Sequence, residues 1–160
     1  MSKGYMRFMR RLVGEKKIQL VESSEDISQS YTKKSENSLK AAKLLLENDL
    51  YEESVSMSYY SMFHKTMAVL RVIGIKCENH SAAIILLKEI FGIDNEDIKF
   101  AKEERVDKQY YTDADVTRVE TKRLVESAEK FIAEVDFFLD GLDENSKRIY
   151  IEKLKLTLDL

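Results

Sequence analysis

The stretch that decides the fold is YYSMFHKTMAVL at residues 59–70. Its apolar side chains recur at helical spacing and spread widely around the helix, which is the pattern of a helix buried on several sides. The same stretch carries two tyrosines and a histidine, so polar side-chain groups belong to a helix that is expected to be buried. We therefore predict a central helix from about Tyr51 to Ile73, ended by Gly74, because glycine readily adopts the left-handed backbone that stops a helix.

The composition of the whole chain also favours helices. Five glycines and no proline in 160 residues leave few backbone breakers, and the chain is rich in Glu, Lys, Leu, Ile and Ala. A chain of this length buries roughly two thirds of its unfolded surface as one domain. We predict an all-α protein that folds as an up-and-down bundle of four to five helices. Short strands can be added to this bundle at the chain ends.

A helix before the central one is predicted from a capping signal. Ser24 precedes Glu25 and Asp26, and a hydroxyl side chain followed by acids satisfies the free N–H groups at a helix N-terminus. This helix is expected to reach about Asn48. It should form an antiparallel hairpin with the central helix.

Further helical segments are expected after the central helix. Asn79 or Ser81 should cap a short helix that Gly92 stops. The remaining expected segments are a helical piece near 98–108, a loop at 112–115 and a last long helix over about 116–139.

The two chain ends differ in periodicity. Residues 1–17 hold six basic residues against Glu15 alone, and their apolar residues keep helix spacing. We expect this basic helix to lay its apolar stripe on the bundle, and contact with phosphate or a membrane surface is the alternative. Residues 18–20 and 154–160 alternate as strands do, so we predict that they pair, within one chain or between two. The predicted divisions are a basic segment (1–22), a bundle (23–142) and a tail (143–160).

The composition also limits the function classes. Cys77 is the single cysteine, and the chain has no signal-peptide pattern or long uncharged apolar run, so we expect a cytoplasmic protein without a membrane segment. His64 and His80 are the only histidines, and neither belongs to the Glu-x-x-His pairs of a di-iron bundle. Glycine-rich phosphate loops and zinc-type cysteine pairs are absent. No metal and no cofactor is predicted.

Three separated blocks are more specific than the composition. They read SYYSMFH at residues 58–64, NHS at 79–81 and RVDKQYY at 105–111. In order and spacing, over about residues 25–140, they resemble the small stand-alone members of the HEPN domain family. The resemblance implies a helical bundle that dimerises. It also implies a metal-independent endoribonuclease motif, in which an arginine is followed after four to six residues by a histidine.

The chain departs from that motif at its most important position. Arg105 is followed by Tyr110 and Tyr111, and no histidine lies between residues 81 and 160. In the mechanism that the resemblance implies, the histidine acts as the general base or acid toward RNA. Tyrosine, with a pKa of about 10, is a poor substitute at neutral pH. Efficient ribonuclease activity is therefore not expected, and whether the protein is an enzyme stays open.

The candidate site residues come from these three blocks. The catalytic candidates are Arg105, His64 and His80. The candidates for nucleotide or RNA binding are Arg105, Asp107, Tyr110, Tyr111 and Tyr60. Each also has a structural interpretation, in which the tyrosines and histidines are hydrogen-bonded core residues and the charged residues belong to a solvated face. If the side chains form a site, His64 and Arg105 should approach one another.

Function is predicted through the resemblance. It implies a nucleotide- or RNA-associated component of a nucleotidyltransferase toxin–antitoxin pair, working as a homodimer beside a minimal nucleotidyltransferase. Tyr110 or Tyr111 would be the hydroxyl that such a transferase modifies. The alternative is a non-enzymatic helical protein-interaction module. A third hypothesis is an active metal-independent ribonuclease.

Overall fold

Helices form nearly all of the fold. The computed structural model describes residues 3–110 and 116–160, with side chains for residues 4–106 and 116–160. In chain order the elements are α1 (Lys3–Gly14), β1 (Ile18–Leu20), α2 (Glu25–Glu47), α3 (Tyr51–Ile73), β2 (Ile75–Cys77), α4 (His80–Glu89), α5 (Glu96–Tyr110), α6 (Arg118–Asp140) and α7 (Glu144–Leu158). These elements confirm the all-α class. The described residues form seven helices, more than the predicted four to five. The two chain ends contribute α1 and α7.

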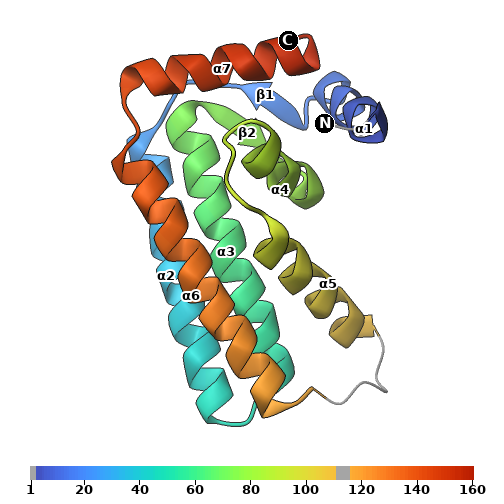
Figure 1. The fold of residues 1–160 in the computed structure, drawn as a ribbon, viewed down its shortest axis with the longest axis vertical. Helices are drawn as coiled ribbons and strands as arrows, with labels where there is room; N and C mark the ends of the chain where they lie inside the picture. The colour runs from blue at the N-terminus through green and yellow to red at the C-terminus, as the bar shows by residue number, and fades with distance from the viewer. Residues whose placement is uncertain (1–2, 111–115) are drawn as a thin grey trace.

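The helix α3 is the centre of the bundle. It contacts α2, α4, α5, α6 and α7. In Figure 1, α2, α3 and α6 run side by side as the long body of the molecule, α5 lies along the other side of α3, and α7 crosses one end. The predicted antiparallel hairpin of α2 and α3 is confirmed. None of the described helices is long and apolar enough to cross a bilayer.

The predicted helix ends have the expected local causes. Ser24 Oγ accepts from the Ile27 N–H at 3.3 Å, and Asn79 Oδ1 accepts from the Ala82 N–H at 3.0 Å, so Asn79 rather than Ser81 caps α4. Gly74 ends α3 at φ 100°, and a Cβ on it would lie 2.7 Å from the backbone oxygen of Val21. Glycine is therefore required both for the backbone conformation and for the close approach.

Small side chains form the contact between α2 and α3. The buried residues of α2 are Ser28, Ser35 and Ala42, spaced seven apart. Ser35 Oγ donates to the Ser61 carbonyl at 2.7 Å, and Ser28 Oγ donates to the Ala68 carbonyl at 3.0 Å. Each hydroxyl donates a hydrogen bond to a backbone carbonyl of α3, so these serines can be buried without leaving a polar atom unpaired. The two helices can therefore pack closely along their length.

The C-terminal segment is a helix, and the strand predicted there is wrong. Asp143 caps α7 by accepting from the Ser146 N–H at 2.7 Å. Leu154 and Leu158 lie four residues apart and are buried, whereas Leu156 between them is 83% exposed. Two leucines on one helical face are buried against the bundle, and this burial outweighs the alternating pattern of the sequence.

The short strand at residues 18–20 is confirmed, but its predicted partner is wrong. It pairs antiparallel with β2, with Ile18 opposite Cys77 and Leu20 opposite Ile75. The left-handed turn at Gly74 sends the chain back beside β1 immediately after α3. The apolar stripe of α1 is buried as expected, at Met9 and Leu12. The loop predicted at residues 112–115 lies outside the described residues.

Candidate functional site

Aromatic side chains of α3 surround His80, the first residue of α4. The Tyr59 hydroxyl and His80 Nδ1 share a 2.7 Å hydrogen bond. The Phe63 ring stacks on the imidazole with 3.8 Å between ring centroids. Tyr59 and Phe63 lie four residues apart, so both project from one side of α3. They hold His80 in a defined orientation at the start of α4.

Arg105 on α5 joins the same cluster. Its guanidinium carbon lies 5.4 Å from the ring centroid of Tyr59 and 4.9 Å from that of Tyr60. These distances are typical of cation–π contacts. No carboxylate among the described side chains forms an ion pair with Arg105. We call Tyr59, Tyr60, Phe63, His80 and Arg105 the site cluster.

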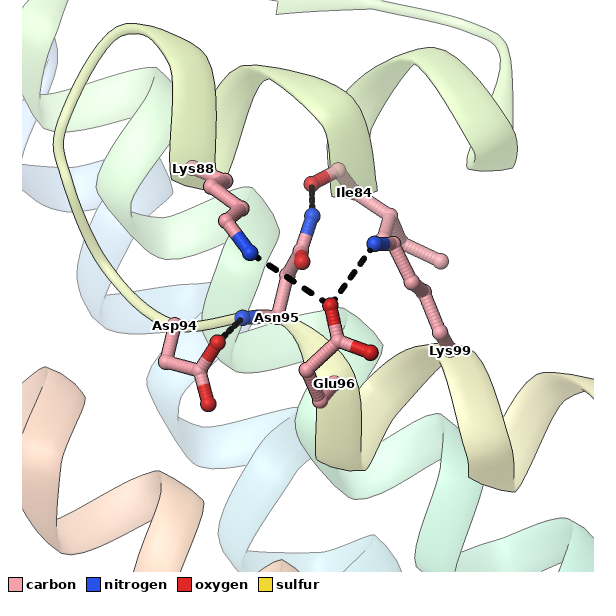
Figure 2. Close-up of polar contacts among 6 residues, drawn as sticks. All are labelled: Ile84, Lys88, Asp94, Asn95, Glu96 and Lys99. Carbon is pink, nitrogen blue, oxygen red and sulfur yellow. Dashed lines mark hydrogen bonds and ion pairs between the residues drawn. The ribbon is translucent and has the colours of Figure 1, made fainter.

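The position of α5 is fixed by the connection from α4, which Figure 2 shows. Asn95, which is 2% exposed, donates from Nδ2 to the Ile84 carbonyl of α4 at 2.7 Å. Glu96 pairs with Lys88 at 3.4 Å and with Lys99 at 3.0 Å. The ion pair with Lys99 lies within α5, whereas the Asn95 hydrogen bond and the Lys88 ion pair tie the start of α5 to α4. They thereby set where Arg105 lies, nine residues after Glu96.

The electrostatic environment of His80 is positive. Burial, followed by the charges of Arg105 and Lys102, lowers the pKa of His80 below its ordinary value. Lys102 Nζ donates to Ser81 Oγ beside the imidazole. Burial raises the pKa of Tyr59 far above its ordinary value, so its hydroxyl keeps its proton at neutral pH. Neutral His80 beside two cations makes this a place where an anion is stabilised.

His64 lies in a different environment from His80. Its Nδ1 is 3.3 Å from Ser38 Oγ on α2, and its ring stacks on Tyr60 with 6.0 Å between centroids. Burial, and then the charge of Lys34, lowers the pKa of His64. His64 and Arg105 therefore neighbour the same ring, that of Tyr60. The hydrogen bond to Ser38 agrees with the structural interpretation of His64, in which its side chain links α3 to α2.

The other predicted site residues cannot be placed by their side chains. Asp107 and Tyr110 belong to α5, but their side chains lie outside the described part, and Tyr111 lies outside the described residues. In the part of the chain that the structure describes, no three His, Cys, Asp or Glu side chains are arranged to hold a metal ion.

Sequence reasoning missed Lys102 as a member of the charged environment. A signal was available, because Lys102 precedes Arg105 by three residues and so shares its helix face.

Two grooves flank the site cluster. One, of about 660 Å³, lies between the adjoining ends of α2 and α3 and has Tyr60 and Arg105 in its wall. The other, of about 530 Å³, is lined by Ser81 and Lys102 and reaches Tyr5 of α1. The arrangement can hold an anionic group at Arg105 and extend a ligand to either side.

Comparisons with known proteins identify the family. The sequence profile of the HEPN domain matches residues 28–138, which include α3, α4, α5 and nearly all of α6. The chain therefore belongs to the HEPN domain family. The match begins in the first turn of α2 and leaves α1, β1 and α7 outside it.

Relatives with curated names agree with this family. A protein of Methanocaldococcus jannaschii named "Putative toxin" is 29% identical over 114 residues, which cover 71% of this chain and 84% of that protein. A UPF0332 protein of Pyrococcus horikoshii is 40% identical over 65 residues, 41% of this chain and 43% of its own length. A UPF0332 protein of Gloeobacter violaceus is 40% identical over 53 residues, 33% of this chain and 42% of that protein.

Proposed function

We propose that this protein binds the phosphate groups of a nucleotide or an RNA strand at the site cluster. The observation that supports this is the positive environment of His80, whose pKa is lowered by burial and by Arg105 and Lys102. A guanidinium group without a described carboxylate partner suits phosphate, because its planar fork of N–H groups matches two phosphate oxygens. A bound phosphate would also favour the protonated form of His80.

The biological setting that we propose is a nucleotidyltransferase toxin–antitoxin pair in the cytoplasm. Membership of the HEPN family and the relative named as a toxin support a toxin-like role. A homodimer and a minimal nucleotidyltransferase are the partners in this proposal. Tyr110 or Tyr111 would accept the nucleotidyl group. Efficient RNA cleavage is not part of it, because the histidine of the family motif is missing after Arg105.

The test is the binding of a fluorescently labelled single-stranded RNA, measured by anisotropy over a range of salt concentrations. Replacing Arg105 with Ala should weaken binding about tenfold and lower the slope of log affinity against log salt by about 1, the effect of one lost phosphate contact. Arg148→Ala is the matched control, since Arg148 is an exposed arginine of α7.

The outcome of this experiment separates the alternatives. Equal losses in the Arg105→Ala and Arg148→Ala variants would mean that binding is diffuse and would refute the site. No RNA or nucleotide binding by the wild-type protein would favour the protein-interaction module instead.

A second candidate function is RNA cleavage with His80 in place of the missing motif histidine. It is favoured by one observation: His80 shares a hydrogen bond with Tyr59, whose ring lies beneath Arg105. Imidazole can act as a general acid or base near neutral pH. Purified protein would cut RNA in this case, and both His80→Gln and Arg105→Ala would lose the activity while His64→Gln kept it. Intact RNA after long incubation would reject the candidate.

A further inference from the structure

The groove between α2 and α3 carries opposite charges at different places along its length. Arg105 and Tyr60 line it at one end. Glu52 and Glu53, both exposed in the first turn of α3, also line it. Glu53 and Tyr60 are seven residues apart, which is about 10 Å along a helix axis. The groove therefore has a cation and carboxylates separated by roughly two turns of helix.

Apart from Ser56 of α3, the floor between these charged groups is apolar. It is formed by Ala41, Leu44 and Leu45 of α2 and Met57 of α3. Leu44 is 51% exposed. A thioether beside aliphatic side chains is a favourable surface for a flat aromatic ring. The volume of about 660 Å³ lies within the range of small-molecule sites.

This order of chemical groups matches a nucleotide. The phosphate is an anion, the base is a flat and largely apolar ring, and the far edge of most bases carries N–H donors. We propose that the groove is a nucleotide site in which Arg105 holds the phosphate, Met57 and its aliphatic neighbours contact the base, and Glu52 or Glu53 reads the edge of the base. This inference rests on the proposed function, because it extends the phosphate site at Arg105.

The carboxylates give the site a base preference. A carboxylate only accepts hydrogen bonds, and guanine presents two adjacent donors, N1–H and N2–H₂, that it can accept together. Adenine and cytosine offer one amino group. Uracil places carbonyl oxygens on either side of its single N–H, so a carboxylate facing it meets two acceptors. Guanine should therefore bind best and uracil worst.

The test compares GMP and UMP, with affinities measured by calorimetry on the full-length protein. GMP should bind about tenfold more tightly, the ratio expected for one good bidentate pair. In the Glu52→Gln/Glu53→Gln variant the ratio should fall toward one, because an amide can also donate to uracil. The control Glu47→Gln removes a nearby exposed carboxylate that does not line the groove and should leave the ratio unchanged.

A second readout locates the base independently of affinity. In protein labelled at the methionine methyl groups, GMP should shift the NMR signal of Met57, whose side chain lines the groove. The methyl group of Met62, which is fully buried, should not move. A GMP complex that leaves the Met57 signal unchanged would overturn the proposal, because the base would then lie elsewhere.

The remaining outcomes distinguish this inference from the proposed function. Arg105→Ala should weaken GMP and UMP equally, so their ratio should persist. Equal wild-type affinities for the two nucleotides, both dependent on Arg105, would refute base recognition and leave the phosphate site in place. Failure to bind GMP, UMP and RNA would refute both.

Discussion

The two sides of α3 are built in opposite ways. Toward α2 and α6, which we call the packed side, serine hydroxyls bond to backbone carbonyls of the neighbouring helix, and Lys65 is only 2% exposed. Toward α4 and α5, the site side, the helix presents Tyr59, Tyr60 and Phe63 to a histidine and an arginine. Small groups allow helices to approach closely, whereas the large aromatic side chains of the site side pack against His80 and Arg105. One helix thus serves as scaffold and carries part of the candidate site.

The largest effect is expected where the packed side is forced open. Replacing Ser35 with Leu inserts bulk between α2 and α3, where Ser35 is fully buried and its Oγ lies 2.7 Å from the Ser61 carbonyl. We expect the free energy of unfolding to fall by about 3 kcal/mol, the upper part of the usual range for overpacking.

Chemical denaturation measures this change, with Ser30→Leu on the exposed face of α2 as the control. The control should change stability by less than about 0.5 kcal/mol. Equal effects of the two substitutions would show that α2 and α3 are not closely packed.

A smaller effect is expected from the ion pair on the packed side. Lys65 on α3 pairs with Asp136 on α6, and the Asp136 side chain is 52% exposed. Asp136→Asn leaves a buried ammonium without its counter-charge and should cost about 2 kcal/mol, less than a fully buried pair because Asp136 remains in contact with water. Adding Lys65→Met should restore most of the loss, since the cation is then gone.

Thermal or urea unfolding of the two single variants and the double variant forms a complete cycle. If Asp136→Asn is neutral, Lys65 is stabilised by other groups, and the contrast between the two sides of α3 is weaker than we describe. A double variant as unstable as Asp136→Asn would point to lost packing rather than unpaired charge.

The smallest effect is expected from pH, and it probes His64 on α3 and His80 beside α3. Burial is the main cause that lowers the pKa of His64 and His80 in the folded protein. Below the ordinary histidine pKa of about 6.5, the unfolded chain therefore binds more protons than the folded chain. Stability from the neutral histidines is complete above that pH and is lost as the pH falls below it.

Urea midpoints at about pH 5.5 and about pH 7.5 measure this slope. The His64→Gln/His80→Gln variant should flatten it. The carboxyl groups whose pKa is lowered, such as Glu15 and Glu96, have ordinary pKa values near 4.5 and act below this window. An unchanged slope in the double variant would assign the pH dependence to other groups.

Much of the fold could be predicted because its signals are local. The start of α2 at Ser24, the cap at Asn79 and the stop at Gly74 depend on neighbouring backbone groups, and the structure has each of them. The tail could not be predicted in the same way. Its leucines alternate, but their structure depends on Leu154 and Leu158 being buried against the bundle.

The site shows the same division. Its blocks could be found because tyrosines, histidines and an arginine interrupt apolar patterns, and the family was identified from their order. Their grouping was only partly anticipated. His64 was expected to approach Arg105, and the structure shows that the charges of Arg105 and Lys102 also act on His80, after burial, to lower its pKa. That effect depends on where Asn95 ties α5 to α4.

By itself, the sequence determined the helices α1 to α6, the cap of α2 at Ser24 and the HEPN class. Helical periodicity and capping act between residues a few positions apart, and the family was identified from short blocks of sequence. Only the tertiary structure decided the partner of β1, the helical state of the tail and the burial of Lys65. It also decided that Tyr59, His80 and Arg105 meet beside an open groove. Those features come from contacts between residues far apart in the chain, where burial and charge depend on which helices pack together.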